Sequence, residues 1–468
     1  MTSTDTGIDV GFINFRSNVK VGTAFVVSIF YLALSLRLFR VISRYAVNIF
    51  FGDAWSFDYT LVADRRSLWQ MFRLLFGPHR QGIGALFSYF IGSWSHWDSR
   101  TETFAVGAVI VCAAGCALLL KKRLYGSIAY TDVAIPLLLL SPSQFEMLVS
   151  YPNPSHGPFP LLLVVLYCLA WTVKPPLFRY GLVLLANFLL IYTGFGLFIG
   201  FFTPVLLSLD FYRNIGEKRL SRCGQLLFLF TVFLSIASLC SFFVGYKFES
   251  AVICYGSREN ATVTFSVKYL FRYLWFMSLM FANFVGKKGI DLLTTTIGGL
   301  ALAACVICLA FCLKRLVVAK TTTWGSKIVP TVLLGYATLF AFSTAVGRLC
   351  LDELGAAQRA RYMPYMAAGL LGVYFCLLCA PRTIARNISI LAFLATALVS
   401  SLSINSADRG AMAWLARGKQ EWKDCYVARH DIGMCDKLAD FRLDPNSDGH
   451  LQDKLDYLQQ KKLNLFAP

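Results

Sequence analysis

The chain has 468 residues, of which 57% are hydrophobic and only 15% are charged. A soluble protein of this size carries about 25% charged residues, so the composition excludes an ordinary soluble enzyme. Lys and Arg number 44 against 26 Asp and Glu. In a membrane protein this excess reflects cytoplasmic loops and attraction to anionic membrane lipid, so we expect no nucleic-acid partner.

Apolar runs of about 18 residues or more, enough to cross a ~30 Å hydrocarbon layer, recur along the chain. We therefore predict an all-α polytopic membrane protein with about eleven transmembrane helices. The glycines of "TGFG" at 193–196 divide a run that is too long for one crossing. The expected ranges are 21–38, 103–120, 131–149, 158–173, 178–193, 196–210, 223–246, 289–312, 328–346, 364–380 and 387–404.

Basic residues in short loops set the orientation, because such loops face the cytoplasm. The basic loops are 121–123, 212–222, 314–320 and 381–386. Counts from the two chain ends agree only if 265–284 does not cross; its Lys268 and Arg272 among aromatics suit an interfacial helix. Residues 82–97 are a second interfacial candidate. We expect a transmembrane domain over 1–404, with the N-terminus inside, and a small outer tail over 405–468.

The outer side receives the larger polar segments, which are 39–102, 247–288, 347–363 and 405–468. The inner loops carry no glycine-rich phosphate-binding motif, so chemistry driven by a soluble nucleotide is not expected. The five histidines are scattered, and no His–Cys cluster has metal-site spacing. We therefore predict no cofactor, and no divalent metal is indicated. Cys425 and Cys435 in the tail could form a disulfide in an oxidising compartment, with two free thiols as the alternative.

Catalysis outside the membrane without ATP requires a substrate that is already activated there, such as a lipid-phosphate sugar. Its transfer needs a carboxylate that takes the proton of an acceptor hydroxyl. Asp53 in "FGDAW" is the first candidate, with Phe51 and Trp55 as stacking partners for the sugar. Asp58 is the second choice, and Glu146, near a helix end, is a third acidic candidate. The alternative for Asp53 is an ordinary solvated loop acid.

The departing phosphate needs cations, and the planar donors of arginine match phosphate oxygens. Arg348 and Arg361 lie at the outer ends of two successive helices, and Tyr362 stands beside Arg361. His79 and Arg80 in "PHRQ" are further candidates for the donor phosphate. Anchoring at the membrane interface is the alternative for these basic residues.

The order of short motifs resembles a known group of enzymes. The motifs are the Asp after the first helix, "HR", "QFE", "VGYKF", "GR…ARY" and the closing "LQQKKLNLF". They resemble bacterial integral-membrane glycosyltransferases of the GT-C superfamily, similar to O-antigen-modifying glucosyltransferases. Pro78 stands where the family often has a Glu, and Met147 and "YPNPSHG" replace polar helix positions.

The resemblance implies an all-helical GT-C-like membrane fold and a polyprenyl-phosphate sugar donor, such as one built on undecaprenyl phosphate. It also implies a glycan or glycolipid acceptor, a place in the bacterial inner membrane with the active site facing the periplasm, and a catalytic acid in the first outer loop. That acid is Asp53 in this chain.

The sequence is also compatible with two other functions. A transporter or flippase also has many helices and interior acids, although no internal repeat of the kind common in transporters is visible. A polymerase or ligase acting on a lipid-diphosphate glycan would also use outer arginines.

Overall fold

The computed structural model describes residues 10–216, 222–247, 265–317, 324–349, 354–402, 404–444 and 450–467. Within these ranges the protein is helical apart from one short hairpin, and eight helices are long and apolar enough to cross a membrane. Large apolar side chains such as Phe230, Phe233 and Ile307 are exposed on them, as expected for surfaces that face lipid. The chain is a polytopic all-α membrane protein.

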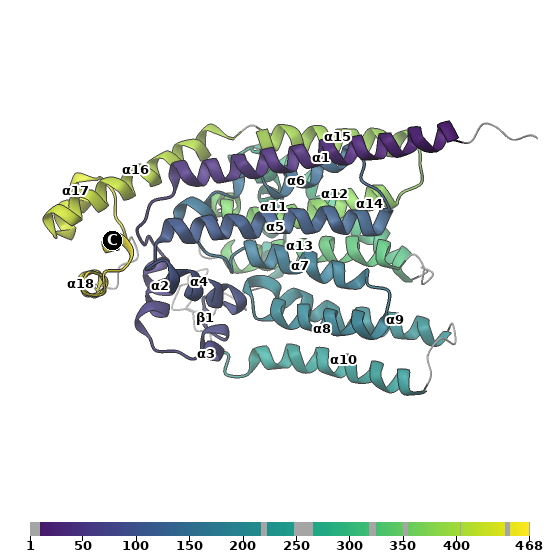
Figure 1. Cartoon of the computed structure of the whole chain (residues 1–468), viewed down its shortest axis with the longest axis horizontal. Helices are drawn as coiled ribbons and strands as arrows, with labels where there is room; N and C mark the ends of the chain where they lie inside the picture. Colours follow the sequence, from purple (N-terminus) through teal and green to yellow (C-terminus); the bar gives the residue numbers. More distant parts are fainter. Residues whose placement is uncertain are drawn as a thin grey trace, which may run out of the picture.

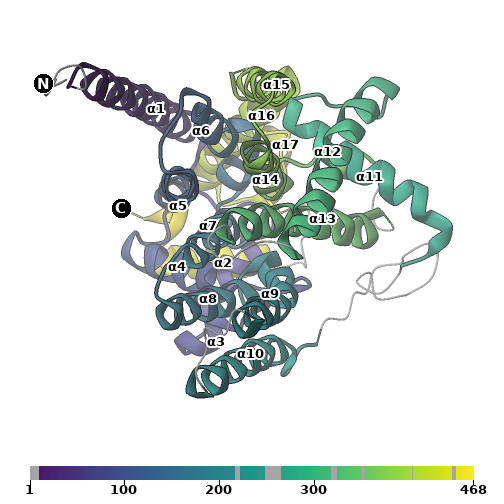
Figure 2. The same cartoon turned by 90° about the vertical axis from the view of Figure 1, so that its right-hand side faces the viewer.

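The long helices lie side by side in Figure 1 and are seen largely end-on in Figure 2. Central α13 and α14 are mostly buried, whereas α10 and α12 leave most of their surface exposed. Shorter apolar helices α7 (Pro158–Trp171) and α8 (Pro176–Ile191) complete the bundle. The long helices are α1 (Val10–Tyr45), α5 (Ser99–Tyr125), α9 (Leu197–Gly216), α10 (Arg222–Phe243), α12 (Leu292–Val317), α13 (Gly325–Leu349), α14 (Met363–Cys379) and α15 (Ile384–Leu402).

The helix predicted over 131–149 is not continuous. A 3-10 turn (Tyr130–Val133) leads into α6 (Ala134–Leu139), and irregular backbone with two short turns, Pro142–Gln144 and Glu146–Ser150, follows. Proline has no N–H and cannot continue a helical hydrogen-bond ladder, so Pro142 favours the break. The Gln144 side chain donates to the Leu139 carbonyl at 2.8 Å, which satisfies a group that the break leaves free.

Segments distant in sequence gather at one end of the bundle, on the left in Figure 1. We call it the tail end. It contains α2 (Ala54–Ala63), α3 (Leu68–Phe72), the hairpin β1–β2 (Leu75–Phe76 and His79–Arg80), α4 (Gly82–Trp94), α16 (Ser406–Arg429), α17 (Ile432–Leu438) and α18 (Leu451–Lys461).

The predicted interfacial segment 265–284 forms a short helix, α11 (Leu270–Ala282). Its 13 residues extend only about 20 Å, less than the ~30 Å hydrocarbon layer. Both flanks lie at the tail end, because Arg73 donates to the Val244 carbonyl at 2.9 Å and Asn405 donates to the Gly286 carbonyl at 2.7 Å. A segment that enters and leaves at the same end agrees with the prediction that it does not cross.

The C-terminal tail is fastened to itself and to the first loop. Cys425 and Cys435 form a disulfide with their Cα atoms 5.6 Å apart. Asn464 is fully buried and donates to the Trp97 carbonyl at 2.7 Å and to Ser99 Oγ at 2.9 Å. Its side-chain oxygen accepts from the Phe50 backbone N–H at 3.1 Å. One amide therefore joins the end of the chain to the loop before α2.

Replacement of Asn464 by Ala should destabilise the protein by about 2–4 kcal/mol, because several buried polar groups lose their partner together. Thermal unfolding of the purified protein in detergent measures this effect. Gln460→Ala, at an exposed position on α18, is the matched control and should leave the midpoint unchanged. Equal midpoints for the two variants would show that Asn464 does not fasten the tail.

Candidate active site at the tail end

The site is built around the irregular segment 151–157 that precedes α7. Asn153 and Ser155 are fully buried, and the Ser155 and His156 backbone N–H groups both donate to Asn153 Oδ1 at 3.1 Å. Gly157 has φ +141°, and a Cβ there would lie 2.7 Å from Pro364 Cγ. This non-helical backbone is therefore held by contacts with the surrounding protein.

Asp53 stands directly before α2, where an Asp side chain commonly caps the helix. It makes no capping hydrogen bond here. Instead its Oδ2 accepts from the Tyr151 hydroxyl at 3.1 Å, and Asn153 Nδ2 lies 3.4 Å from that hydroxyl. Burial and then the Asp53 carboxylate raise the pKa of Tyr151, so the phenol stays protonated and donates. The carboxylate is therefore aimed at the irregular segment.

Arg361 and Glu146 form the second part of the cluster. The Glu146 carboxylate accepts from the Arg361 backbone N–H at 3.2 Å, and its other oxygen lies 3.6 Å from Arg361 Nε. This Nε is buried and has no hydrogen-bond acceptor among the described residues. The guanidinium also interacts electrostatically with Tyr362, Tyr151 and Asp53. Arg361 thus lies among both acids, with its buried Nε facing the Glu146 carboxylate.

Two histidines extend the cluster toward α13. The Nε2 atoms of His79 and His156 are in contact, and the His79 ring lies 4.6 Å from the ring of Phe195. Burial, and then the positive charge of Arg348, lowers the pKa of His79 to about 3. Burial, His79, Arg361 and Arg348 lower the pKa of His156 well below its usual range. Both rings are therefore neutral near pH 7, one donating to the other.

The structure thus brings together six residues predicted from the sequence, namely Asp53, Glu146, Arg361, Tyr362, His79 and Arg348. Arg80 lies elsewhere: it donates to the carbonyls of Phe242 and Val244, at the end of α10. Adjacent residues of β2 therefore point to different surroundings.

The predicted stacking pair is not open to a sugar in this structure. Trp55 is fully buried and meets Phe50 edge-on, with ring centroids 5.5 Å apart. Phe51 stacks on Phe441 of the tail at 5.2 Å. Both rings hold the Asp53 loop against its neighbours.

Asp58 is fully buried, and neither of its oxygens has a hydrogen-bond partner among the described residues. Burial and the neighbouring Glu102 raise its pKa well above the usual range. Burial of this kind disfavours the charged carboxylate that a general base needs, so Asp58 is poorly suited to that role. The geometry therefore favours Asp53 over Asp58.

Sequence reasoning did not identify Tyr151, His156 or Lys419. Lys419 of α16 is buried, donates to the Val149 carbonyl at 2.6 Å and to the Ser150 carbonyl, and lies 5.1 Å from the centre of the Phe51 ring. It joins the tail to both the Asp53 loop and the Glu146 segment. For Tyr151 and His156 the available signal was "YPNPSHG", in which polar residues alternate with prolines beside a membrane segment.

The pH dependence of protein stability tests whether the histidine pair is buried and neutral. The folded pKa of His79 lies below its ordinary value of 6.5, so its stabilising contribution is complete above pH 6.5 and is lost progressively toward pH 3. Between pH 7 and pH 5, His79→Gln should therefore lose less thermal stability than the wild type. His450→Gln, exposed in the tail, is the control. An identical acid loss in His79→Gln and the wild type would contradict burial of a neutral pair.

The chain matches no family model, no curated protein and no solved structure. The family resemblance of its short motifs therefore stands on the residues alone.

Proposed function

We propose that the protein is a membrane glycosyltransferase of the GT-C type. It transfers a sugar from a polyprenyl-phosphate donor to a hydroxyl of a glycan or glycolipid acceptor, on the outer face of a bacterial inner membrane. The observation that carries this proposal is the convergence of Asp53 and Arg361 on Tyr151: the carboxylate accepts from the phenol at 3.1 Å, and the guanidinium interacts with both groups. A base and a cation at one point are what this transfer requires.

In the proposed reaction the acceptor oxygen attacks the anomeric carbon of the donor sugar. The bond between that carbon and the phosphate oxygen breaks, and polyprenyl phosphate leaves with the electron pair. Asp53 takes the proton of the acceptor hydroxyl, so no further reactant is needed. A single displacement of this kind inverts the anomeric configuration.

Arg361 is assigned to the phosphate, because it lies beside Asp53 and a planar guanidinium matches phosphate oxygens. Glu146 orients it through the backbone N–H and Nε contacts. Arg348 adds positive charge beside the histidine pair. Tyr151 holds the Asp53 carboxylate in place.

We also propose eleven membrane crossings, in which α7, α8 and the 131–149 segment join the eight long helices. Contacts of the 131–149 segment support this. Near its start, Asp132 accepts from Tyr374 of α14 at 2.6 Å and pairs with Lys121 at 2.5 Å. Near its end, Ser150 accepts from Lys419 at the tail end. The segment therefore runs from one end of the bundle to the other although its second half is irregular.

Asp53→Asn keeps size and hydrogen bonding but removes the base, so turnover should fall by roughly 10²–10⁴-fold. The assay uses purified protein and a panel of radiolabelled polyprenyl-phosphate sugars, and follows release of polyprenyl phosphate. Donor binding should persist, because the phosphate contacts lie on other residues. Near-normal turnover of Asp53→Asn together with inactive Asp58→Asn or Glu146→Gln would exclude Asp53 as the base. Movement of intact donor across the membrane without release would instead indicate a flippase.

The topology predicts sidedness of labelling. Cysteines introduced at the exposed positions Lys247 and Lys287, which flank 265–284, should react with an impermeant thiol reagent from the same side. Lys122→Cys, at the opposite end of the bundle, should react from the other side. Opposite reactivity of Lys247→Cys and Lys287→Cys would show that 265–284 crosses and that the proposed count is wrong.

A further inference from the structure

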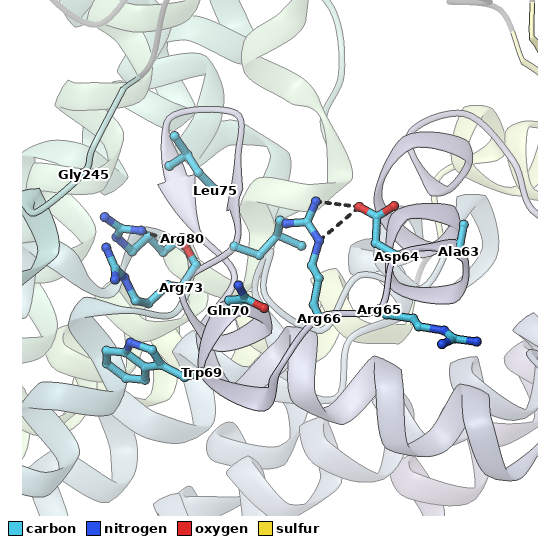
Figure 3. A pocket seen from close by; sticks show the side chains of 11 residues that line it. Ala63, Asp64, Arg65, Arg66, Trp69, Gln70, Arg73, Leu75, Arg80 and Gly245 are labelled. Carbon is cyan, nitrogen blue, oxygen red and sulfur yellow. Dashed lines mark hydrogen bonds and ion pairs between the residues drawn. The ribbon is translucent and has the colours of Figure 1, made fainter.

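A second polar site lies beside the hairpin. The structure has a pocket of about 840 Å³ that is lined by the end of α2, by α3, by the hairpin and by Gly245 (Figure 3). His79 of β2 belongs to the cluster of Asp53 and Arg361, whereas its neighbour Arg80 lines this pocket. The charged lining residues are Asp64, Arg65, Arg66, Arg73 and Arg80.

Arg73 and Arg80 form a pair of like charges in the pocket wall. Arg80 is 3% exposed, and its guanidinium donates to the carbonyls of Phe242, Val244 and Arg73 at 2.7–2.9 Å. Arg73 Nη2 donates to the same Val244 carbonyl at 2.9 Å. Figure 3 shows the two guanidinium groups next to each other. Carbonyl oxygens orient these groups but do not neutralise them.

The acid in the pocket lining does not compensate this pair. Asp64 bonds Arg66 at 2.7 Å, on the other side of the pocket (Figure 3). Within the described ranges, neither Arg73 nor Arg80 forms an ion pair with a carboxylate. A partly buried pair of uncompensated guanidinium groups attracts an anion strongly.

An aromatic side chain flanks the pair. The Trp69 ring lies 5.7 Å from the Arg73 guanidinium and is 51% exposed, and Leu68 beside it is also exposed. An exposed tryptophan next to basic residues at the end of a membrane bundle is typical of the lipid headgroup level. The open side of the arginine pair thus lies where phosphate esters are abundant.

We propose that this pocket binds a phosphate-bearing group through Arg73 and Arg80, as a second site separate from the Arg361 cluster. The Arg73 donors that the Val244 carbonyl does not use match the oxygens of a phosphate, and Arg80, held by carbonyls, adds its positive charge. Trp69 and Leu68 favour a phosphate carried by a membrane lipid over a soluble phosphate ester. The proposal holds whether or not the chain transfers sugars.

The test is native mass spectrometry of the full chain in detergent, with phosphatidic acid or with diacylglycerol, which lacks the phosphate. The wild type should retain phosphatidic acid in preference to diacylglycerol. Arg73→Gln keeps a donor for the Val244 carbonyl but removes a charge, so it should bind the lipid at least about tenfold more weakly. Arg417→Gln, an exposed arginine of α16, is the matched control and should bind like the wild type.

Two further measurements distinguish a specific site from misfolding, and a lipid phosphate from a soluble one. Asp64→Asn removes the acid from the pocket lining and should strengthen binding a few-fold, a gain that misfolding cannot imitate. Inorganic phosphate is the soluble probe, scored by thermal stabilisation. Stabilisation that requires Arg73, without lipid retention, would support the site and assign it to soluble phosphate esters. If Arg73→Gln and Arg417→Gln behave alike with both probes, the proposal is overturned.

Discussion

A guanidinium taken out of water at the end of a membrane bundle requires groups around it that replace the lost hydration. At Arg361 these groups come from two distant segments, with Asp53 in the first loop and Glu146 and Tyr151 after α6, and from the ring of the next residue, Tyr362. The irregular backbone after α6 places Glu146 and Tyr151 beside the Arg361 guanidinium. That backbone in turn exposes carbonyls, and Lys419 of the tail donates to two of them. The tail therefore stabilises the backbone that carries Glu146 and Tyr151.

The hairpin divides the polar chemistry of the tail end into two parts. His79 contacts His156 in the cluster, whereas Arg80 faces α10 and the pocket. This division follows from the alternation of side chains along a strand, which sends neighbours to opposite faces. His79 and Arg80 are neighbours in the sequence, but His79 belongs to the proposed transfer site and Arg80 to the proposed phosphate site. A substitution in one site is therefore expected to leave the other site intact.

Composition and apolar runs predicted the class of protein, because hydropathy over about 18 residues reports directly on burial in lipid. Eight of the predicted crossings correspond to long apolar helices in the described ranges. The sequence predicts one helix over 131–149, because hydropathy does not register the effect of Pro142 on the hydrogen-bond ladder. Asp53, Glu146 and Arg361 stand out as candidates in the sequence, since charges at helix ends are costly in a membrane.

Contacts between these residues were not predictable in the same way. Tyr151 is 98 residues from Asp53, and Glu146 is 215 residues from Arg361. The sequence predicts Arg80 at the donor phosphate beside His79, but the Phe242 carbonyl, 162 residues away, holds its guanidinium in the wall of the second pocket. A basic residue of the Asp53 cluster and one of a separate pocket look alike in a sequence. Packing between distant segments decides the difference, and no local pattern records it.

The proposed reaction is a direct displacement at the anomeric carbon, with the Asp53 carboxylate as its base. The most direct measurement is the anomeric configuration of the transferred sugar, read by NMR from the coupling of its anomeric proton in the product made by the purified protein. A direct displacement predicts inversion relative to the polyprenyl-phosphate donor. Retention of configuration would contradict a single back-side displacement by the acceptor hydroxyl.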